Sequence, residues 1–491
     1  MKKRIFSMFL VALLGVSALS AGCGKKSEGI PMNDSFYNPI RLEQNMGDPW
    51  MYYHDGYYYY MQSSGTQIKV TKSAWMTQVV ENIEDENVTK VIFRQKSINV
   101  VEIWAPEIFF FDGHWYVYFT ATTDSTDTLE KDTNRRIYGM KSKTDNAMGE
   151  WETAVKIDLP ADCRAIDATF MDYDGKQYII WSGWPSETNS DYKQNLYITE
   201  LETGNPLKAK SLNADQRVLI SQPTYGWETK GAVQNEGPAV CFSPEGTPFV
   251  LFSGSYSGGD GYCIGYLELT GDPMKTESWI KSKEPLMQTD MKYSEVIAPG
   301  HCSVVKSPDQ TETWICYHAA KYSGAGWDRM ARLQKMDWVD GKPSVEQISK
   351  FNEAVPLPSG EDVNRVKYEA ESAELKDCTV IDSEGYASGD RAVSVMDGGN
   401  LTFNVSVPKN GQYLLYVRFS NREATETVMN VEINGDKYEL YAPKTEYDDL
   451  FVQTYTYCPL YIKKSGKNTV RITCDKSIYI DCIIVDYLDN V

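Results

Sequence analysis

Hydrophobic positions along this chain recur in tight aromatic runs, and each run follows directly on an acidic turn. An Asp-Gly or Glu-Gly turn between apolar segments predicts a β-hairpin, because glycine adopts the positive φ that a tight turn needs. The turns and their runs occupy residues 55–60, 112–116, 174–178, 245–249 and, more weakly, 309–314. Five hairpins at nearly constant spacing predict five copies of one small sheet, arranged radially as a five-bladed β-propeller.

Polar residues stand at similar offsets ahead of the five hairpins, inside segments that are otherwise apolar. The first strand of every propeller blade lines the central channel, so these residues are expected to converge near the axis. They are Asp48, Glu107, Asp167, Glu236 and His301. Random surface acids would not keep register with a structural repeat, and the pattern therefore predicts a functional site on the axis.

Three acids around one pocket indicate glycoside hydrolysis, since no serine–histidine, cysteine or nucleotide motif accompanies them. That reaction needs one protonated carboxylic acid for the leaving oxygen and one ionised carboxylate that activates water or attacks carbon. A third carboxylate can raise the pKa of the acid by like-charge repulsion. We assign this chemistry to Asp48, Asp167 and Glu236. For Glu107 a carboxylate that caps backbone N–H groups is the favoured interpretation.

The propeller pattern is followed by a second region in which hydrophobic residues have a different spacing. A Pro-, Gly- and acid-rich stretch at 356–362 predicts a linker, and short runs of alternating polarity after it predict an antiparallel, jelly-roll-like β-sandwich. The expected organisation is all-β, with a propeller at 35–357, a linker at 358–366 and a sandwich at 367–491. No helix of useful length is expected.

The first residues have the pattern of an export signal. Three basic residues precede an apolar core at 5–16 and small residues at 20–22, so 1–22 is predicted to be a signal peptide. Residues 20–23 resemble a bacterial lipobox, which implies lipidation of Cys23, a tether at 23–34 and a location on the outer face of a bacterial membrane. Simple secretion is the alternative.

Composition limits the kinds of binding partner that the protein is expected to have. The net charge is −19, from 49 basic and 68 acidic residues, which argues against nucleic acid as a partner. The nine cysteines after Cys23 show no metal-ligand spacing, so neither a metal cluster nor a disulfide framework is indicated. We expect a monomer that meets the membrane only through its lipid.

Four motifs around the axial acids are similar to those of glycoside hydrolase family 43. They are residues 47–50, 103–107, 165–170 and 235–238. The resemblance implies a five-bladed propeller that hydrolyses arabinose- or xylose-containing polysaccharides with inversion. It also implies that Asp48 is the general base, Glu236 the general acid and Asp167 the group that tunes and orients the acid.

Further segments look like the arabinofuranosidase branch of that family, at 181–184, 194–198, 220–228, 317–320 and 326–329. By this resemblance Arg329 lines the −1 sugar pocket, and Trp104 contacts substrate, although a core role for Trp104 stays open. His301 is similar to the axial histidine that faces a metal ion, usually calcium. A hydrogen-bonded histidine without metal is the alternative.

The C-terminal region resembles carbohydrate-binding module family 6 at residues 368–371, 385–389 and 480–483. That likeness implies a structural calcium ion held by Glu369, Glu371 and Asp481, an all-oxygen set that suits the cation. It also implies that Tyr386 and Phe451 bracket a sugar ring. A purely structural sandwich is the alternative.

The leading hypothesis is a lipid-anchored α-L-arabinofuranosidase that acts on arabinan or arabinoxylan and needs no cofactor for its chemistry. A β-xylosidase or an endo-arabinanase on the same scaffold is the enzymatic alternative, because loops around the pocket decide the substrate. Retaining fructan hydrolases also have five blades, but their acid stands in a Glu-Cys context. A surface lipoprotein that only captures glycan is the non-enzyme alternative.

Overall fold

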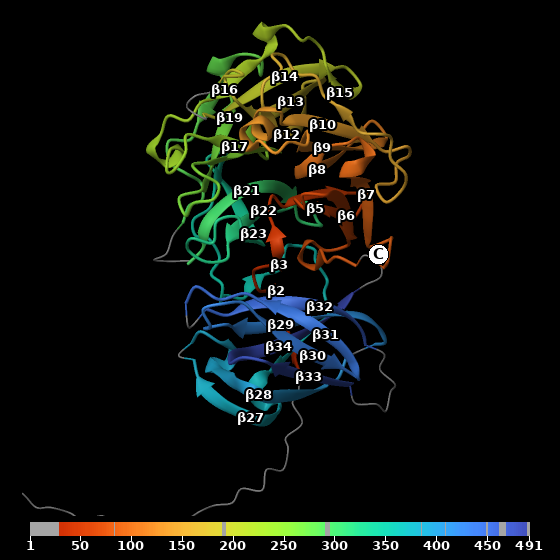
Figure 1. Ribbon diagram of the computed structural model, residues 1–491, viewed down its shortest axis with the longest axis vertical. Coiled ribbons are helices and arrows are strands. Elements are labelled where there is room, and N and C mark those ends of the chain that lie inside the picture. Colours follow the sequence, from red (N-terminus) through yellow and green to blue (C-terminus); the bar gives the residue numbers. More distant parts are fainter. Residues whose placement is uncertain are drawn as a thin grey trace, which may run out of the picture.

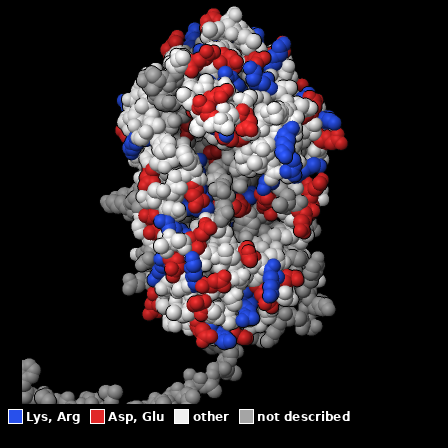
Figure 2. Space-filling view, viewed as in Figure 1, with Lys and Arg blue, Asp and Glu red and all other residues white. Residues whose placement is uncertain are grey.

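The computed structural model describes residues 29–488 except 83, 189–192, 290–294, 384, 408, 448–449 and 461–467. The predicted signal peptide, Cys23 and the first part of the tether lie outside the described residues. Within the described part, no helix is both long and apolar enough to cross a membrane. On the face drawn in Figure 2, basic side chains are interspersed with acidic ones and form no extended basic surface.

Five antiparallel sheets arranged around an axis form the predicted propeller (Figure 1). The first blade contains β4 (Trp50–His54), β5 (Tyr57–Met61), β6 (Gln67–Ser73) and β7 (Thr89–Arg94). The second contains β8 (Val101–Phe111), β9 (His114–Thr122), β10 (Arg136–Lys141) and β11 (Val155–Lys156). The third contains β12 (Ala165–Tyr173), β13 (Lys176–Gly183), β14 (Asn195–Glu202), β15 (Asn205–Ala209) and β16 (Val218–Ser221).

The fourth blade contains β17 (Asn235–Phe242), β18 (Pro248–Gly254), β19 (Cys263–Leu269) and β20 (Trp279–Lys281). The fifth contains β21 (Ile297–Lys306), β22 (Thr313–Ala320), β23 (Arg329–Val339) and β24 (Lys342–Ser344). Each predicted hairpin is the turn between the first two strands of a blade. At the first of them Gly56 has a φ of 83°, the left-handed conformation that the Asp-Gly signal requires.

The ring is closed by the N-terminal strand β3 (Arg41–Met46). It pairs antiparallel with β23 of the fifth blade, with Met46 opposite Arg329 and Arg41 opposite Ala331. Beside it, β2 (Ser35–Phe36) pairs with β25 (Val355–Pro356). The two ends of the propeller sequence therefore meet in the fifth blade and close the ring.

The C-terminal strands form the predicted sandwich, one hydrogen-bonded set of ten strands (Figure 1). They are β1 (Ile30–Pro31), β26 (Arg365–Glu369), β27 (Glu374–Asp382), β28 (Arg391–Val405), β29 (Gly411–Ser420), β30 (Thr427–Ile433), β31 (Asp436–Ala442), β32 (Val452–Leu460), β33 (Asn468–Cys474) and β34 (Ile478–Leu488). Alternate residues such as Phe403, Leu415 and Ile472 are fully buried between the layers. Strand β1, within the segment expected to be a tether, pairs with β26.

Helices are short, as expected. The α-helix α1 (Thr128–Thr133) begins at Asp127, whose carboxylate accepts from the N–H groups of Leu129 and Glu130. Single 3-10 turns are η1 (Met76–Gln78), η2 (Gln95–Ser97), η3 (Ala214–Gln216), η4 (Gly226–Glu228), η5 (Thr276–Ser278), η6 (Ala370–Ser372) and η7 (Ser388–Asp390). None of the nine described cysteines forms a disulfide.

The sandwich packs closely against the propeller, and polar side chains join the two. Gln78 Nε2 donates to Asp486 Oδ1 at 2.8 Å, and Arg365 Nη2 donates to Thr77 Oγ1 at 2.7 Å. Tyr455 donates its hydroxyl to Glu43 Oε1 at 2.8 Å. Buried, directional bonds of this kind hold two domains in one relative orientation.

Candidate active site

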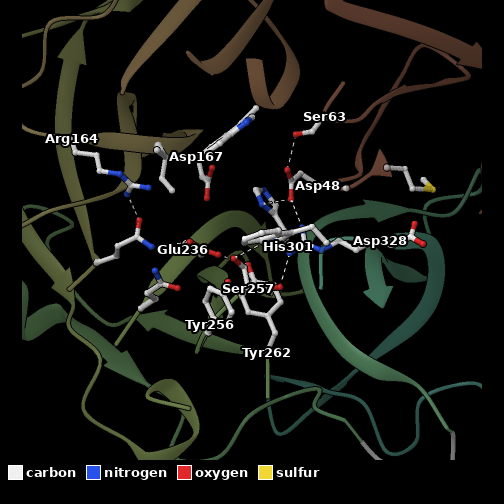
Figure 3. Close-up of a pocket in the computed structure, with 18 residues that line it drawn as sticks. Asp48, Ser63, Arg164, Asp167, Glu236, Tyr256, Ser257, Tyr262, His301 and Asp328 are labelled. Carbon is white, nitrogen blue, oxygen red and sulfur yellow. Dashed lines mark hydrogen bonds and ion pairs between the residues drawn. The ribbon is translucent and has the colours of Figure 1, made fainter. Parts of the chain in front are cut away.

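A cavity of about 590 Å³ opens at the propeller axis (Figure 3). Four of the five axial residues predicted from the repeat line it: Asp48, Asp167, Glu236 and His301. Glu107 does not line the cavity. It is 1 % exposed, its carboxyl oxygens accept no backbone N–H in the described part of the chain, and burial raises its pKa well above the usual range. The capping role favoured for Glu107 is therefore wrong.

Irregular backbone at the inner strands aims these side chains into the cavity. The pairing of β12 with β13 shifts between Ile166 and Thr169, around Asp167, and the pairing of β21 with β22 shifts between Gly300 and Cys302, around His301. Asp167 has a φ of 53° and Asp48 a φ of 51°. A β-bulge changes the direction of a side chain relative to its neighbours on the strand, and a positive φ is uncommon for residues other than glycine.

Asp48 lies among donors and cations. Ser63 Oγ donates to its Oδ2 at 2.6 Å, His301 Nδ1 lies 3.3 Å from its Oδ1, and Arg329 Nη1 lies 3.4 Å from the same oxygen. Burial opposes ionisation of Asp48, but the charge of His301, its hydrogen bond and the charge of Arg329 outweigh burial. Together they hold the pKa of Asp48 well below its usual range. Asp48 is consequently an ionised carboxylate at neutral pH.

Glu236 lies on another side of the cavity from Asp48 (Figure 3). Tyr262 donates its hydroxyl to Glu236 Oε1 at 2.9 Å, and Gln194 Nε2 donates to Oε2 at 2.9 Å. Gln194 in turn accepts a hydrogen bond from Arg164, whose Nε donates to Asp132 Oδ1 at 3.0 Å. The two donors fix the plane and direction of the carboxyl group.

Asp167 is 5 % exposed and lies near both other acids. Its Oδ2 accepts from the N–H of Gly237 at 3.2 Å, directly after Glu236 in the chain. Burial raises the pKa of Asp167 to about 7; the charge of His301 opposes this rise, and the charges of Glu236 and Asp48 add to it. Gly237 has a φ of 58°, and a Cβ there would lie 2.9 Å from the ring of His301, so only glycine fits this close approach.

His301 is the cationic partner of this acid group. Burial disfavours its protonated form, but the charge of Asp48 outweighs burial and raises the pKa of His301 to about 9. The Nδ1 of His301 faces Asp48 Oδ1, and a calcium ion beside this histidine stays a prediction.

The two residues expected to contact sugar both line the cavity. Arg329 Nη2 donates to the carbonyl of Ser257 at 2.7 Å while its other nitrogen faces Asp48. One face of the Trp104 ring is covered by Arg135, whose Cζ lies 3.3 Å from the ring centroid. Trp104 therefore stands in the wall of the cavity with its ring held by a cation.

The sandwich residues expected to bind glycan are not arranged as predicted. Phe451 is 1 % exposed and packs with Ala387 and Ala392, so its ring cannot stack on a sugar. Tyr386 is 40 % exposed. The prediction for Phe451 is wrong because the apolar run around it belongs to the core.

Among the expected calcium ligands, Glu369 and Asp481 are close together. With Cys482 they form the only group of three His, Cys, Asp or Glu ligand atoms within 4.8 Å of one another in the described residues. Asp481 Oδ2 accepts from Arg418 Nε at 2.6 Å, and Glu369 Oε1 lies 2.9 Å from Lys367 Nζ. Glu371 is near this group, and its Oε2 is buried without a hydrogen-bond partner.

Several residues that shape the cavity gave no signal in the repeat. Outside the inner strands, the spacing of the repeat does not predict which residues reach the site. Glu236 is contacted from there by Gln194 and Tyr262, and Gln194 is contacted by Arg164. His318 is buried and neutral, because burial and the charge of Arg329 lower its pKa well below the usual range. Its Nδ1 accepts from the backbone N–H of Asp48 at 3.1 Å.

The cavity holds an ionised carboxylate, a second carboxyl group across from it and a third carboxyl group that is electrostatically coupled to both. Such a set can activate water and protonate a leaving oxygen. The propeller and this site define the protein as a glycoside hydrolase. The model of the glycosyl hydrolases family 43 matches residues 36–343, and the chain belongs to that family.

Similar proteins share most of the chain. An extracellular exo-α-(1→5)-L-arabinofuranosidase of Streptomyces avermitilis is 30 % identical over 359 residues, which cover 70 % of each protein. The crystal structure of an α-L-arabinofuranosidase from Lactobacillus brevis is 28 % identical with a TM-score of 0.56 and covers 65 % of this chain and 98 % of its own. A Phanerochaete chrysosporium exo-β-1,3-galactanase shares the fold, with 14 % identity, a TM-score of 0.50, and coverage of 93 % of this chain and 100 % of its own.

Proposed function

We propose that this protein is an inverting, exo-acting α-L-arabinofuranosidase that releases terminal arabinose from arabinan or arabinoxylan. The observation that carries the proposal is the pairing of an ionised Asp48 with a Glu236 carboxyl group held by Tyr262 and Gln194 across one cavity. Several similar proteins are named as arabinofuranosidases, which supports arabinose as the sugar that is released.

In this mechanism Asp48 accepts a proton from water as the water oxygen forms its bond to the anomeric carbon. Glu236 donates its proton to the glycosidic oxygen as the bond between that oxygen and the anomeric carbon breaks. The protein ends with a proton on Asp48 and none on Glu236, and solvent restores both. Asp167 keeps a proton within the Asp167–Glu236 pair near neutral pH, because two neighbouring carboxylates resist joint ionisation.

A substrate panel tests the reaction. Wild-type protein should hydrolyse 4-nitrophenyl α-L-arabinofuranoside and α-1,5-arabinotriose faster than 4-nitrophenyl β-D-xyloside. Release of internal fragments from linear arabinan would point to endo action. Hydrolysis of the xyloside alone would replace the proposal with a β-xylosidase, and turnover of none of these substrates would favour a glycan-capture role.

Two variants test the roles of the acids. Asp48→Asn and Glu236→Gln should each lower turnover by about 10² to 10⁴, as expected for loss of acid–base assistance. With a dinitrophenyl leaving group, which needs no proton, the Glu236→Gln variant should regain much of its rate. The Asp48→Asn variant should not, because water still lacks its base. Equal recovery of both variants would contradict the assignment.

The remaining proposals concern the frame around the site. Residues 35–357 form the catalytic domain and 367–491 a carbohydrate-binding-like sandwich, joined at 358–366 and preceded by a lipoprotein signal at 1–22.

Glu371 supports a calcium ion beside Glu369 and Asp481. The charges of these two residues add to burial in raising the pKa of Glu371, and a cation would offset that repulsion between carboxylates. Cys23→Ser should abolish partition of the mature protein into detergent.

A further inference from the structure

One wall of the cavity is a loop of the fifth blade, residues 321–328, which connects β22 to β23. Its Trp327 and Asp328 line the cavity, and Arg329 follows directly at the start of β23. Inside the loop, Lys321 Nζ lies 2.7 Å from Asp328 Oδ1, and the backbone N–H of Lys321 donates to the carbonyl of Asp328 at 3.1 Å. The loop is thus closed at its base, and its tip depends on contacts with its surroundings.

Trp327 is an exposed aromatic residue at the rim of this cavity. It is 59 % exposed, whereas Arg329 and Glu236 deeper in the site are 6 % and 7 % exposed. Its Nε1 donates to Ser257 Oγ at 3.3 Å, and its ring meets that of Tyr256 edge to face at 5.9 Å. A solvent-facing tryptophan held at the rim of a polar cavity offers a flat apolar surface to a sugar ring.

The outer side of the loop rests on the sandwich. Glu446 Oε2 accepts from the backbone N–H of Ser323 at 2.7 Å, and Lys444 Nζ lies 3.9 Å from the centroid of the Tyr322 ring. Tyr441 packs in the same way, with its ring centroid 4.7 Å from Lys321 Nζ. These contacts come from the end of β31 and the segment after it.

The propeller holds the same loop from the other side. Asp260 accepts from Ser323 Oγ at 2.5 Å and from the N–H of Gly324 at 3.0 Å. Ser323 is therefore bonded to the propeller through its side chain and to the sandwich through its backbone. Removing either partner leaves Ser323 bonded on one side only.

We propose that the sandwich is part of the substrate site: Lys444 and Glu446 are positioning residues that hold loop 321–328 so that Trp327 stacks on the sugar beyond the scissile bond. The assignment to that sugar rests on the proposed exo action. The terminal arabinose occupies the buried end beside Asp48 and Arg329, so the rest of the glycan leaves across the exposed rim.

The experiment compares two substrates and three variants. α-1,5-Arabinotriose reaches the rim, whereas methyl α-L-arabinofuranoside has a leaving group too small to touch Trp327. The brace is removed in Lys444→Ala/Glu446→Ala. Lys437→Ala/Glu439→Ala is the matched control, since it deletes the same charges from exposed positions of β31. Trp327→Ala removes the stacking surface without altering the domain contact.

We expect Trp327→Ala and the brace variant to lower kcat/KM for arabinotriose about tenfold, mainly through KM, as for loss of one aromatic contact face. Their kcat/KM for the methyl glycoside should stay within about twofold of wild type, and the control should change neither substrate. Unchanged arabinotriose kinetics, or equal losses on both substrates, would overturn the proposal. If the double variant does not fold, Glu446→Ala alone takes its place.

Hydrogen–deuterium exchange separates this proposal from the proposed function. Loss of the acceptor at Glu446 should speed exchange of the Ser323 amide at least about tenfold, while peptides of the inner strands stay protected. This readout does not require the protein to act on arabinose. If wild type cleaves neither substrate, the proposed function fails, and unchanged exchange at Ser323 then refutes the brace independently.

Discussion

Asp167 offers a sharp test of how the site keeps its acid protonated. Asp167→Asn removes a negative charge while the amide oxygen can still accept from Gly237 N–H, so the backbone beside Glu236 keeps its hydrogen bond. Burial raises the pKa of Asp167 to about 7, with the charges of Glu236 and Asp48 adding to the rise and His301 opposing it. The two carboxyl groups are electrostatically coupled, so the observable pKa values belong to the pair.

The sign of the pH effect follows from this coupling. In wild type the pair holds a proton below about pH 7 and loses it as the pH rises, so kcat/KM should fall on the basic side with an apparent pKa near 7. Without the charge of Asp167 this coupling is absent. Like-charge coupling of roughly one to three pKa units, about 1.4 to 4 kcal/mol, predicts that the basic limb moves down by that amount.

The assay is the pH dependence of kcat/KM for 4-nitrophenyl α-L-arabinofuranoside between pH 4 and 9, with circular dichroism at each pH. At pH 7 the variant should be roughly 10 to 10³ times slower than at its own optimum, and it should recover toward acid pH. Asp172→Asn, an exposed acid on the same strand β12, is the control. A basic limb that stays near pH 7 in Asp167→Asn would refute the charge coupling.

Three further predictions address other parts of the molecule. NMR of the first-formed product should show the β-anomer of arabinose, because inversion places water opposite the leaving group; the α-anomer would indicate retention. Chelation should lower the melting temperature of wild type but not of Glu371→Gln if a calcium ion stabilises the sandwich. A chain ending at residue 359 should unfold at lower temperature, since Gln78 and Thr77 then lack their partners. Its arabinotriose activity should fall, since loop 321–328 then lacks Glu446 and Lys444.

The features that could be predicted from the sequence are those that depend on a regular spacing of residues. The acidic turns predicted the five hairpins, and the register of Asp48, Asp167, Glu236 and His301 predicted that they meet on one axis. That register could not identify Gln194 or Tyr262, because these residues approach Glu236 from outside the repeated inner strands.

Predictions without a periodic signal were weaker. Phe451 was expected to stack on a sugar ring, but Leu450 and Val452 on either side are also buried. An apolar run of three residues is compatible with either a binding surface or a core. The composition of residues 356–362 predicted a linker, whereas Glu446 and Lys444 contact the propeller through ordinary surface residue types. Such contacts depend on how two domains meet, which a single sequence does not encode in any repeat.

The pairing of β1 with β26 has a consequence for how the enzyme would work on a cell surface. Strand β1 starts at Ile30, seven residues after Cys23, and a fully extended chain spans at most about 3.6 Å per residue. A lipid on Cys23 would therefore keep the sandwich within about 25 Å of the bilayer. Glycan would have to diffuse to the enzyme, so an anchored enzyme of this geometry suits soluble fragments more than intact cell wall.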